Sequence, residues 1–420
     1  MSVFDVVNNI LKIVGDAVAG FIISILGANP FADIVVMLLA ALVICSLCAV
    51  TFMGLTWAER KVVARIQDRI GPNQAGPYGL MQPLADGIKM FTKEDTTPAE
   101  ADRWVYNIAP LVISVFALLT YAVIPFAPGV VGTNLNIGVF YVIAVGSGST
   151  IAILMAGWGS NNKYSLLGAF RTVAQLVGYE VPMLLNVLPV VMLSGSMSLI
   201  DIIDRQTSAN GAHGIPFILV IPLSALIFLI SGIAETGRSP FDLLEAESEI
   251  VAGFHVEYSG MKFALFFLGE YVNALAVSMM FAVLFLGGYA GPVLPPYIWL
   301  IIKVGAVFVV LMWLRGTLPR VRVDHLMSFN WKFLVPLSIV NVIMVAVLAK
   351  VFVADPAQVA ATGGILVDAK IQALILFLAN AGLLVAALSL VARQVRQLRL
   401  VEAEDLEKRR AENMQAVAAH

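Results

Sequence analysis

Residues 33–57 read "DIVVMLLAALVICSLCAVTFMGLTW", and this run decides the fold class. Its only charged residue is Asp33, at the first position. A transmembrane helix needs about 20 consecutive apolar residues, because the hydrocarbon core of a bilayer is about 30 Å thick. The run therefore predicts a helix that crosses a membrane.

The composition extends this prediction to the whole chain. Of the 420 residues, 60% are hydrophobic and only 13% are charged, whereas a soluble domain is about a quarter charged. A chain in lipid must satisfy its backbone hydrogen bonds internally, which long helices do. We therefore expect an all-α, polytopic transmembrane helical bundle. No basic patch with interleaved aromatic residues is present, so nucleic acid is not an expected partner.

Nine apolar runs are long enough to predict spans. They are residues 33–57, 105–127, 137–159, 166–195, 216–234, 261–287, 296–315, 332–353 and 371–393. The first eight would form a core over residues 31–354. The ninth, within 355–394, and a charged tail, 395–420, would follow it. Residues 1–30 have apolar residues at helical spacing and predict an interfacial helix, with a further span as the alternative.

The positions of Lys and Arg predict the orientation of the bundle. Each loop is numbered here after the span that precedes it. Lys and Arg concentrate in the odd-numbered loops and in the tail. The cytoplasmic side of a membrane protein carries the excess of Lys and Arg. We therefore expect the N-terminus outside and the C-terminus in the cytoplasm. The expected cytoplasmic loops are residues 57–104, 159–165, 235–260 and 316–331.

Metal and haem ligands are not expected in this chain. Cys45 and Cys48 form a C-x-x-C pair inside an apolar run, without the second pair or histidines that a metal site would need. None of the four histidines lies in the middle of a span, as paired haem ligands would. We therefore expect no redox centre of its own in this chain.

The first cytoplasmic segment contains a second kind of helix. Leu80, Leu84, Ile88 and Phe91 repeat at helical spacing and predict an amphipathic helix, with Asp86 off the apolar stripe. Such a helix either lies on the lipid headgroups or covers an apolar cavity that opens at the membrane surface. Composition alone favours the first interpretation.

The loop at residues 235–260 reads "ETGRSPFDLLEAESEIVAGFHVEYSG" and is strongly acidic. One arginine, Arg238, cannot neutralise so many carboxylates, and neighbouring carboxylates repel, so they titrate as a coupled set. The pattern favours proton handling over a solvated acidic loop, because apolar residues between the acids would bury much of the segment. The acidic residues are Glu235, Asp242, Glu245, Glu247, Glu249 and Glu257.

Charged residues also fall inside the predicted spans. Arg171 begins the fourth span, and Glu180 lies nine residues further into it. Glu270 and Lys303 lie in the sixth and seventh. An ionisable group within a span is costly and marks a functional site by default. For Lys303, snorkelling of the ammonium to the interface is an equal alternative.

Four long motifs in this order resemble one known family. They are "ERKVVARIQDRIGPNQAGPYGLMQPLADGIKMFTKED", "RTVAQLVGYEVP", "ETGRSPFDLLEAESEIVAGFHVEYSGMKFALFFLGEY" and "WLRGTLPRVRVDHLMSFNWKFLVP". The chain is similar, over roughly residues 33–353, to the H subunit (called subunit 1 in mitochondria) of proton-pumping NADH:quinone oxidoreductase, respiratory complex I. Several long motifs in one order are far more specific than a single short pattern. The ninth span and the tail go beyond the family's eight-span core.

The resemblance implies a membrane subunit of a translocase in a bacterial plasma membrane. It would contact other membrane-arm and peripheral-arm subunits, and ubiquinone or menaquinone would be the substrate. NADH, flavin and iron–sulfur sites would lie on partner subunits. The implied quinone-tunnel residues are Arg60, Arg69, Asp86, Arg238, Asp242, Glu245, Phe254, Glu257 and Tyr258. The implied funnel for proton coupling comprises Glu180, Glu235, Glu247, Glu249 and Glu270, to which we add Arg171 and Lys303 as candidates.

Two other interpretations remain open from the sequence. The first keeps the family but places the chain in a membrane-bound hydrogenase-type complex. The second is a stand-alone ion-coupled transporter or channel, which the charges inside spans would suit. Transporters usually have repeated halves, however, and no internal repeat is evident here.

Overall fold

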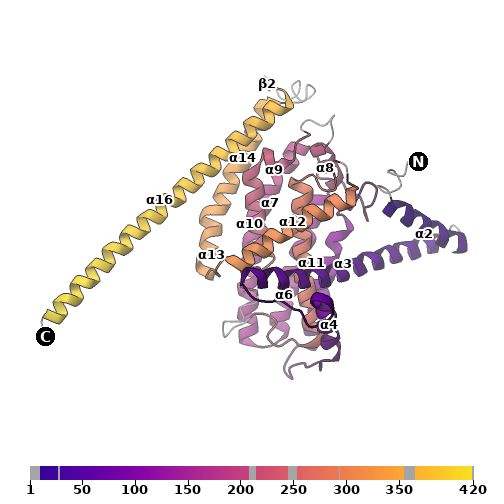
Figure 1. Cartoon of the computed structure of the whole chain (residues 1–420), viewed down its shortest axis with the longest axis horizontal. Coiled ribbons are helices and arrows are strands. Elements are labelled where there is room, and N and C mark those ends of the chain that lie inside the picture. Colours follow the sequence, from indigo (N-terminus) through magenta and orange to yellow (C-terminus); the bar gives the residue numbers. More distant parts are fainter. Residues whose placement is uncertain are drawn as a thin grey trace.

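The computed structural model describes residues 10–26, 29–207, 214–244, 253–292, 294–353 and 365–418. Within these ranges the chain is helical apart from loops and one short parallel strand pair, β1 (Phe352–Val353) and β2 (Ile365–Leu366). Figure 1 shows the helices gathered into one bundle, with the two ends of the chain projecting from it.

Eight helices among the described residues are long and apolar enough to cross a membrane. They are α3 (Pro30–Ile66), α5 (Arg103–Leu119) with η2 (Thr120–Ala122), α6 (Gly138–Gly159), α7 (Lys163–Ser194), α11 (Gly260–Phe285), α12 (Pro296–Thr317), α13 (Val323–Phe329) continuing through η3 (Asn330–Leu334) into α14 (Val335–Val351), and α16 (Ala369–Ala418). The shorter helices are α2 (Ile10–Leu26), η1 (Pro77–Gly79), α4 (Gln82–Thr92), α8 (Leu199–Thr207), α9 (Phe217–Val220) and α10 (Pro222–Glu235). The predicted all-α polytopic membrane bundle is confirmed.

The fifth predicted span is not one continuous helix. The structure divides it into α9 and α10, with Ile221 between them at φ −129° and ψ 64°. Pro222 has no N–H to donate and clashes with a helical residue before it, so the chain breaks at Ile221. The predicted span over 216–234 therefore consists of two helices, a division that the hydropathy of the run does not indicate. The 14 residues of α10 span only about 21 Å at 1.5 Å per residue.

The short helix α10 lies in the middle of the bundle. It packs against α7, α11, α14 and α16, and most of its residues are buried. Phe228 of α10 contacts two rings of α11, Phe281 and Phe285, with centroids 6.2 and 5.6 Å away. This apolar packing holds the end of α10, and with it Glu235, deep inside the protein.

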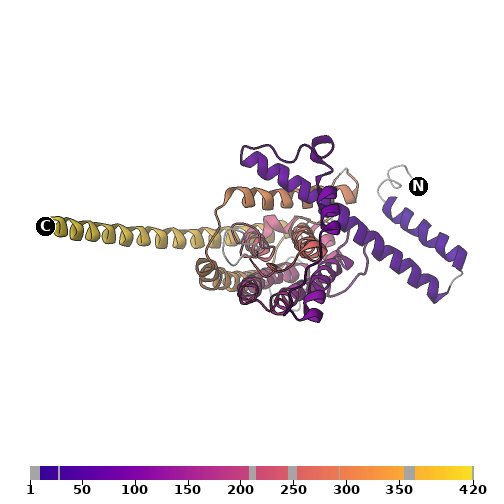
Figure 2. The same ribbon diagram turned by 90° about the horizontal axis from the view of Figure 1, so that it is seen from below.

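The four loops predicted to be cytoplasmic meet at one end of the bundle. Asn161 donates a hydrogen bond to the carbonyl oxygen of Glu100, which joins the first and third loops. The amide of Val321 donates to the carbonyl of Pro240, which joins the seventh and fifth. Figure 2 shows the same bundle from below, with α16 extending away from it. The orientation of this end towards the cytoplasm stays a prediction, and we call it the loop end.

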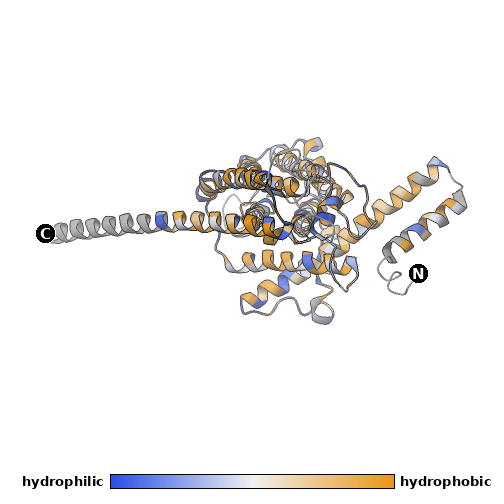
Figure 3. Cartoon of the chain, turned by 90° about the horizontal axis from the view of Figure 1, so that it is seen from above, coloured by the Kyte–Doolittle hydropathy of each residue, from blue (hydrophilic) through white to orange (hydrophobic). Residues whose placement is uncertain are grey.

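The ninth predicted span is the first half of α16. It packs against α9, α10 and α14, and Ala373 and Leu376 belong to the buried core. Hydrophobic colouring covers the spanning helices and this half of α16 in Figure 3. At the other end, α2 confirms a helix within residues 1–30, while its interfacial position stays a prediction.

Candidate functional site

A buried carboxylate joins three elements at the loop end. Glu59, near the end of α3, is 4% exposed and pairs with Arg238 at 3.1 Å. It also accepts a short hydrogen bond from Arg315 near the end of α12. Removing ions from water is costly unless they are paired. These three residues therefore form one electrostatic unit, which we call the charged junction.

Aromatic rings hold the arginine at the centre of the junction. Arg238 follows α10 in the chain and is 1% exposed. Its guanidinium lies 4.9 Å from the ring centre of Tyr271 on α11 and 5.0 Å from that of Phe308 on α12. A cation over an aromatic face is attracted by the ring quadrupole, most strongly when it is desolvated. Arg238 is therefore fixed between two spanning helices.

A partly open cavity of about 40 Å³ lies near the junction. Glu235 and Glu270 both line it. Oε2 of Glu235 is buried without a hydrogen-bond partner among the described residues. The cavity has room for about three waters, which would supply the missing bonds. Its other polar lining residues are Thr120, Ser149, Thr236 and Asn273.

The carboxylates continue from this cavity into the bilayer region. Glu180 on α7 interacts electrostatically with Glu235. The side chain of Ser147 on α6 lies within hydrogen-bonding distance of Glu180. Glu270 lies within electrostatic range of Arg238 and of Glu59. The structure thus brings Glu180, Glu235 and Glu270 close together.

Three of the implied tunnel residues, Arg60, Arg69 and Asp86, lie at or near the surface. Asp86 of α4 forms an ion pair with Arg60 at 2.6 Å. Arg69 is exposed, and its Nε donates to Gln67. The predicted amphipathic helix is confirmed as α4, and its apolar residues Ile88 and Phe91 are 57% and 73% exposed. Within the part of the chain that the structure describes, this apolar face stays largely exposed.

A stacked tyrosine pair fastens the end of the acidic loop. The rings of Tyr106 (α5) and Tyr258 are parallel, with centroids 4.1 Å apart. Each hydroxyl donates to a backbone carbonyl of the opposite segment, Tyr106 to Glu257 at 2.8 Å and Tyr258 to Tyr106 at 3.0 Å. Burial raises the pKa of Tyr258, so its hydroxyl stays protonated and donates. We call Tyr106 and Tyr258, together with Glu257 and Lys262 that contact Tyr106, the tyrosine clamp.

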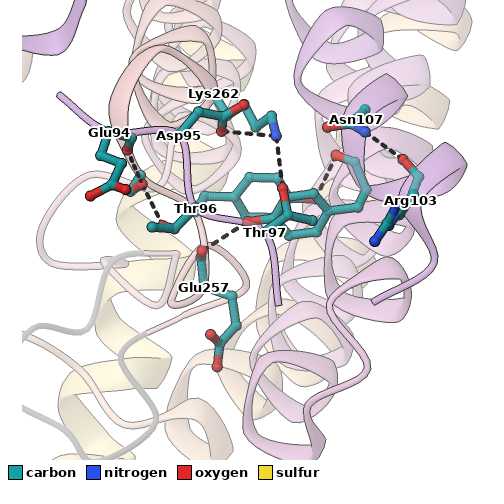
Figure 4. Close-up of polar contacts among 11 residues, drawn as sticks. Glu94, Asp95, Thr96, Thr97, Arg103, Asn107, Glu257 and Lys262 are labelled. Carbon is teal, nitrogen blue, oxygen red and sulfur yellow. Dashed lines mark hydrogen bonds and ion pairs between the residues drawn. The ribbon is translucent and has the colours of Figure 1, made fainter. Parts of the chain in front are cut away.

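Figure 4 shows the polar contacts around this clamp. Lys262 forms an ion pair with Asp95 at 2.9 Å and lies over the ring of Tyr106. The side chain of Glu257 accepts a hydrogen bond from Asn162, the N-cap residue of α7, at 2.6 Å. The clamp therefore joins the first, third and fifth loops.

Two further side chains lie next to the clamp. Phe254 is 2% exposed and packs edge-on against Phe266 of α11. His255 lies between rings of Phe254 and Phe263, and burial lowers its pKa to about 4. Neutral His255 is therefore the favoured form in the folded loop.

The remaining predicted site residues lie elsewhere. Arg171 on α7 donates to the carbonyl of Leu243 in the fifth loop at 2.9 Å. Asp242, the residue before Leu243, is half-buried. Lys303 lies near the opposite end of the bundle and donates to three carbonyls of the α11–α12 loop. Glu245, Glu247 and Glu249 fall outside the described residues.

Sequence reasoning missed Glu59 and Tyr106. Glu59 directly precedes Arg60 and Lys61, so it looks like part of the charged flank that ends a span. The available signal was the position of Glu59, two residues after the apolar run 33–57. A carboxylate that is buried at such a place needs a partner of opposite charge. Nothing in the sequence names its partners, because Arg315 lies 256 residues away.

The fold and the site define a class: a multi-pass helical membrane protein whose buried charges meet at one end of the bundle. The family model described as NADH dehydrogenase matches residues 38–346. The H subunit of NADH-quinone oxidoreductase from Dehalococcoides mccartyi (strain CBDB1) is 53% identical over 290 residues, which cover 69% of this chain and 80% of that protein.

Two other relatives agree. The H subunit from Carboxydothermus hydrogenoformans is 45% identical over 314 residues, covering 74% of this chain and 88% of that protein. Its counterpart from Geobacillus kaustophilus is 46% identical over 296 residues, covering 69% and 87%. The chain belongs to the family of NADH-quinone oxidoreductase H subunits, which confirms the resemblance.

Proposed function

We propose that this chain is the membrane subunit of a proton-translocating NADH:quinone oxidoreductase that admits quinone and couples its reduction to proton movement. The observation that supports this most directly is the continuity of the buried charges. They run from the charged junction at the loop end, through the cavity beside Glu235 and Glu270, to Glu180 on α7. A connected set of titratable groups can pass on a change of charge.

The reaction would be divided between this chain and its partners. Flavin and iron–sulfur clusters on partner subunits would deliver electrons to a quinone. In this chain, Arg60, Arg69 and Asp86 would form the mouth of the tunnel. Inner tunnel positions would be Arg238, Asp242, Glu245, Phe254, Glu257 and Tyr258.

Coupling would begin with a change of charge near the acidic loop. Quinone reduction consumes protons, which would change the shared protonation of Glu245, Glu247 and Glu249. The change would then pass through Glu235 and Glu270 to Glu180, and onward to neighbouring membrane subunits. The tyrosine clamp supports this route because it fixes one end of the acidic loop, while the carboxylates of the loop would respond to the change of charge.

A cationic groove marks the surface for the peripheral partners. Lys61 and Arg65 in the last turns of α3, and Arg69 just after the helix, line this groove with Asp68. Asp86 and Asp95 pair with other cations of the loop end. We propose that an acidic surface of a peripheral subunit binds this groove, since opposite charges steer association.

Besides the charges inside spans, the break between α9 and α10 is a feature that favours the rival transporter. Broken helices hold ions in many transporters. Here Phe217, Val220 and Ile221 at the break are apolar and fully buried, and the carboxylates of α7, α10 and α11 described above lie towards the loop end. The position of the charges therefore favours the quinone enzyme.

Photolabelling tests the tunnel in the assembled complex. A photoreactive quinone should label peptides within residues 57–104 or 235–260, and excess ordinary quinone should suppress the label. No suppressible label on this chain would contradict the tunnel.

A Glu180→Gln variant tests the coupling route and should lose proton pumping. A Glu100→Gln variant, which removes an exposed carboxylate at the loop end, should keep it. Wild-type pumping by Glu180→Gln would contradict the route.

A further inference from the structure

Glu59 holds together three elements that are remote in the chain. Within the described residues, it is the one carboxylate that forms ion pairs with Arg238 and Arg315. Its own side chain is 5% exposed and that of Arg238 is fully buried. Water therefore screens this contact less than it screens an ion pair at the surface.

The charges of the junction do not cancel. Two guanidinium groups, that of buried Arg238 and that of partly exposed Arg315, face one carboxylate, which leaves an excess of one positive charge in the junction. On α11 this excess faces Glu270 and Tyr271, and from the acidic loop it faces Asp242. A nearby positive charge favours the ionised form of a carboxylate, so the balance of the junction acts on Glu270, which lines the cavity.

The position of Arg238 depends on few contacts. Its Nε, Nη1 and Nη2 atoms are buried and lack hydrogen-bond acceptors of good geometry among the described residues. What fixes the guanidinium is the ion pair with Glu59 and the two rings of Tyr271 and Phe308. Without the carboxylate, the guanidinium is free to turn its unused donors towards Glu270.

Resting on the function proposed above, we propose that Glu59 is a positioning residue for coupling. It neutralises one of the two guanidinium groups and holds Arg238 between Tyr271 and Phe308. It thereby fixes how large the remaining positive charge is and how far this charge lies from Glu270, which lines the cavity. Glu59 acts through these arginines and touches no substrate.

The test uses the assembled complex with Glu59→Gln, Glu59→Asp and the control Glu100→Gln. Electron transfer from NADH to a water-soluble acceptor reports assembly. Quinone reduction and protons pumped per electron, each measured across pH 5.5–9, report coupling. Glu59→Gln should lower the pumping ratio about tenfold, within the energies measured for coupled buried groups. Its pH profile should move to lower pH, because the extra positive charge favours ionised carboxylates.

The carboxylate variant separates charge from shape. Glu59→Asp keeps the negative charge on a shorter side chain and should retain most of the pumping ratio with an unshifted pH profile. Glu100→Gln should match the wild type in every measurement. A wild-type pumping ratio and pH profile in Glu59→Gln would overturn the proposal.

A charge-balanced double variant covers the case in which Glu59→Gln fails to assemble. Glu59→Gln combined with Arg315→Gln restores the original excess of one positive charge. It should recover assembly and the position of the pH profile, and a double variant no better than Glu59→Gln would overturn the proposal. If the wild-type complex neither reduced quinone nor pumped, the function proposed above would fail. Normal wild-type coupling with an unaffected Glu59→Gln would refute only this inference.

Discussion

Removing the hydroxyl of Tyr106 should loosen the end of the acidic loop by a measurable amount. The hydroxyl donates to the carbonyl of Glu257 at 2.8 Å, and Tyr106 is fully buried. A typical hydrogen bond contributes about 1 kcal/mol net, and Glu257 is partly exposed, so water can replace part of it. Tyr106→Phe should therefore lower the opening free energy of residues 253–260 by about 1 kcal/mol.

Truncation to alanine extends the series. Tyr106→Ala also removes the ring that stacks on Tyr258 at 4.1 Å. Large-to-small changes at buried aromatic residues cost about 3–5 kcal/mol. The two substitutions thus predict a graded effect, because both weaken the same contact between α5 and the fifth loop while only alanine leaves a cavity.

Hydrogen exchange in the assembled complex measures this effect. The amide of Tyr258, which donates to the carbonyl of His255, reports opening of the segment. An opening free energy lower by about 1 kcal/mol raises its exchange about fivefold, and alanine should raise it about a hundredfold or more. Unchanged exchange in Tyr106→Ala would refute the clamp. An equal rise in α14, far from the clamp, would show general destabilisation instead.

Three further predictions address the other contacts. His255 has a pKa of about 4 in the folded loop against about 6.5 unfolded. Its contribution to stability is therefore complete above pH 6.5 and is lost as the pH falls towards 4, and hydrogen exchange of the loop should show this loss only when His255 is present. Gly168→Ala would place a Cβ 2.6 Å from the backbone of Gly253 and should cost about 1–3 kcal/mol by overpacking, seen as a lower melting temperature of the complex. Lys303→Met leaves three carbonyls without their donor and should make the α11–α12 loop more sensitive to protease, whereas exposed Lys350→Met should not.

The fold class was predictable because lipid imposes a strong rule on sequence. A span must be apolar over about 20 residues, so the run at 33–57 and its counterparts are visible without any tertiary information. The amphipathic helix α4 was visible for a related reason, its single apolar stripe. The break at Ile221 also had a local signal, Pro222, which the hydropathy of the surrounding run concealed.

The site was only partly predictable. Glu180 and Glu270 stand out in sequence because a carboxylate within a span is unusual. Glu59 and Tyr106 do not stand out, because each lies at the edge of a span where charged and aromatic residues are ordinary. Their importance comes from partners in other loops, such as Arg238 and Glu257.

By itself, the sequence determined that this chain crosses a membrane many times and carries costly carboxylates near one set of loops. Only the tertiary structure decided which charges compensate one another. Hydropathy is a sum over neighbouring residues, so the chain reveals it locally. Charge pairing depends on distance in space, and the three groups of the junction meet only after α3, α10 and α12 have packed.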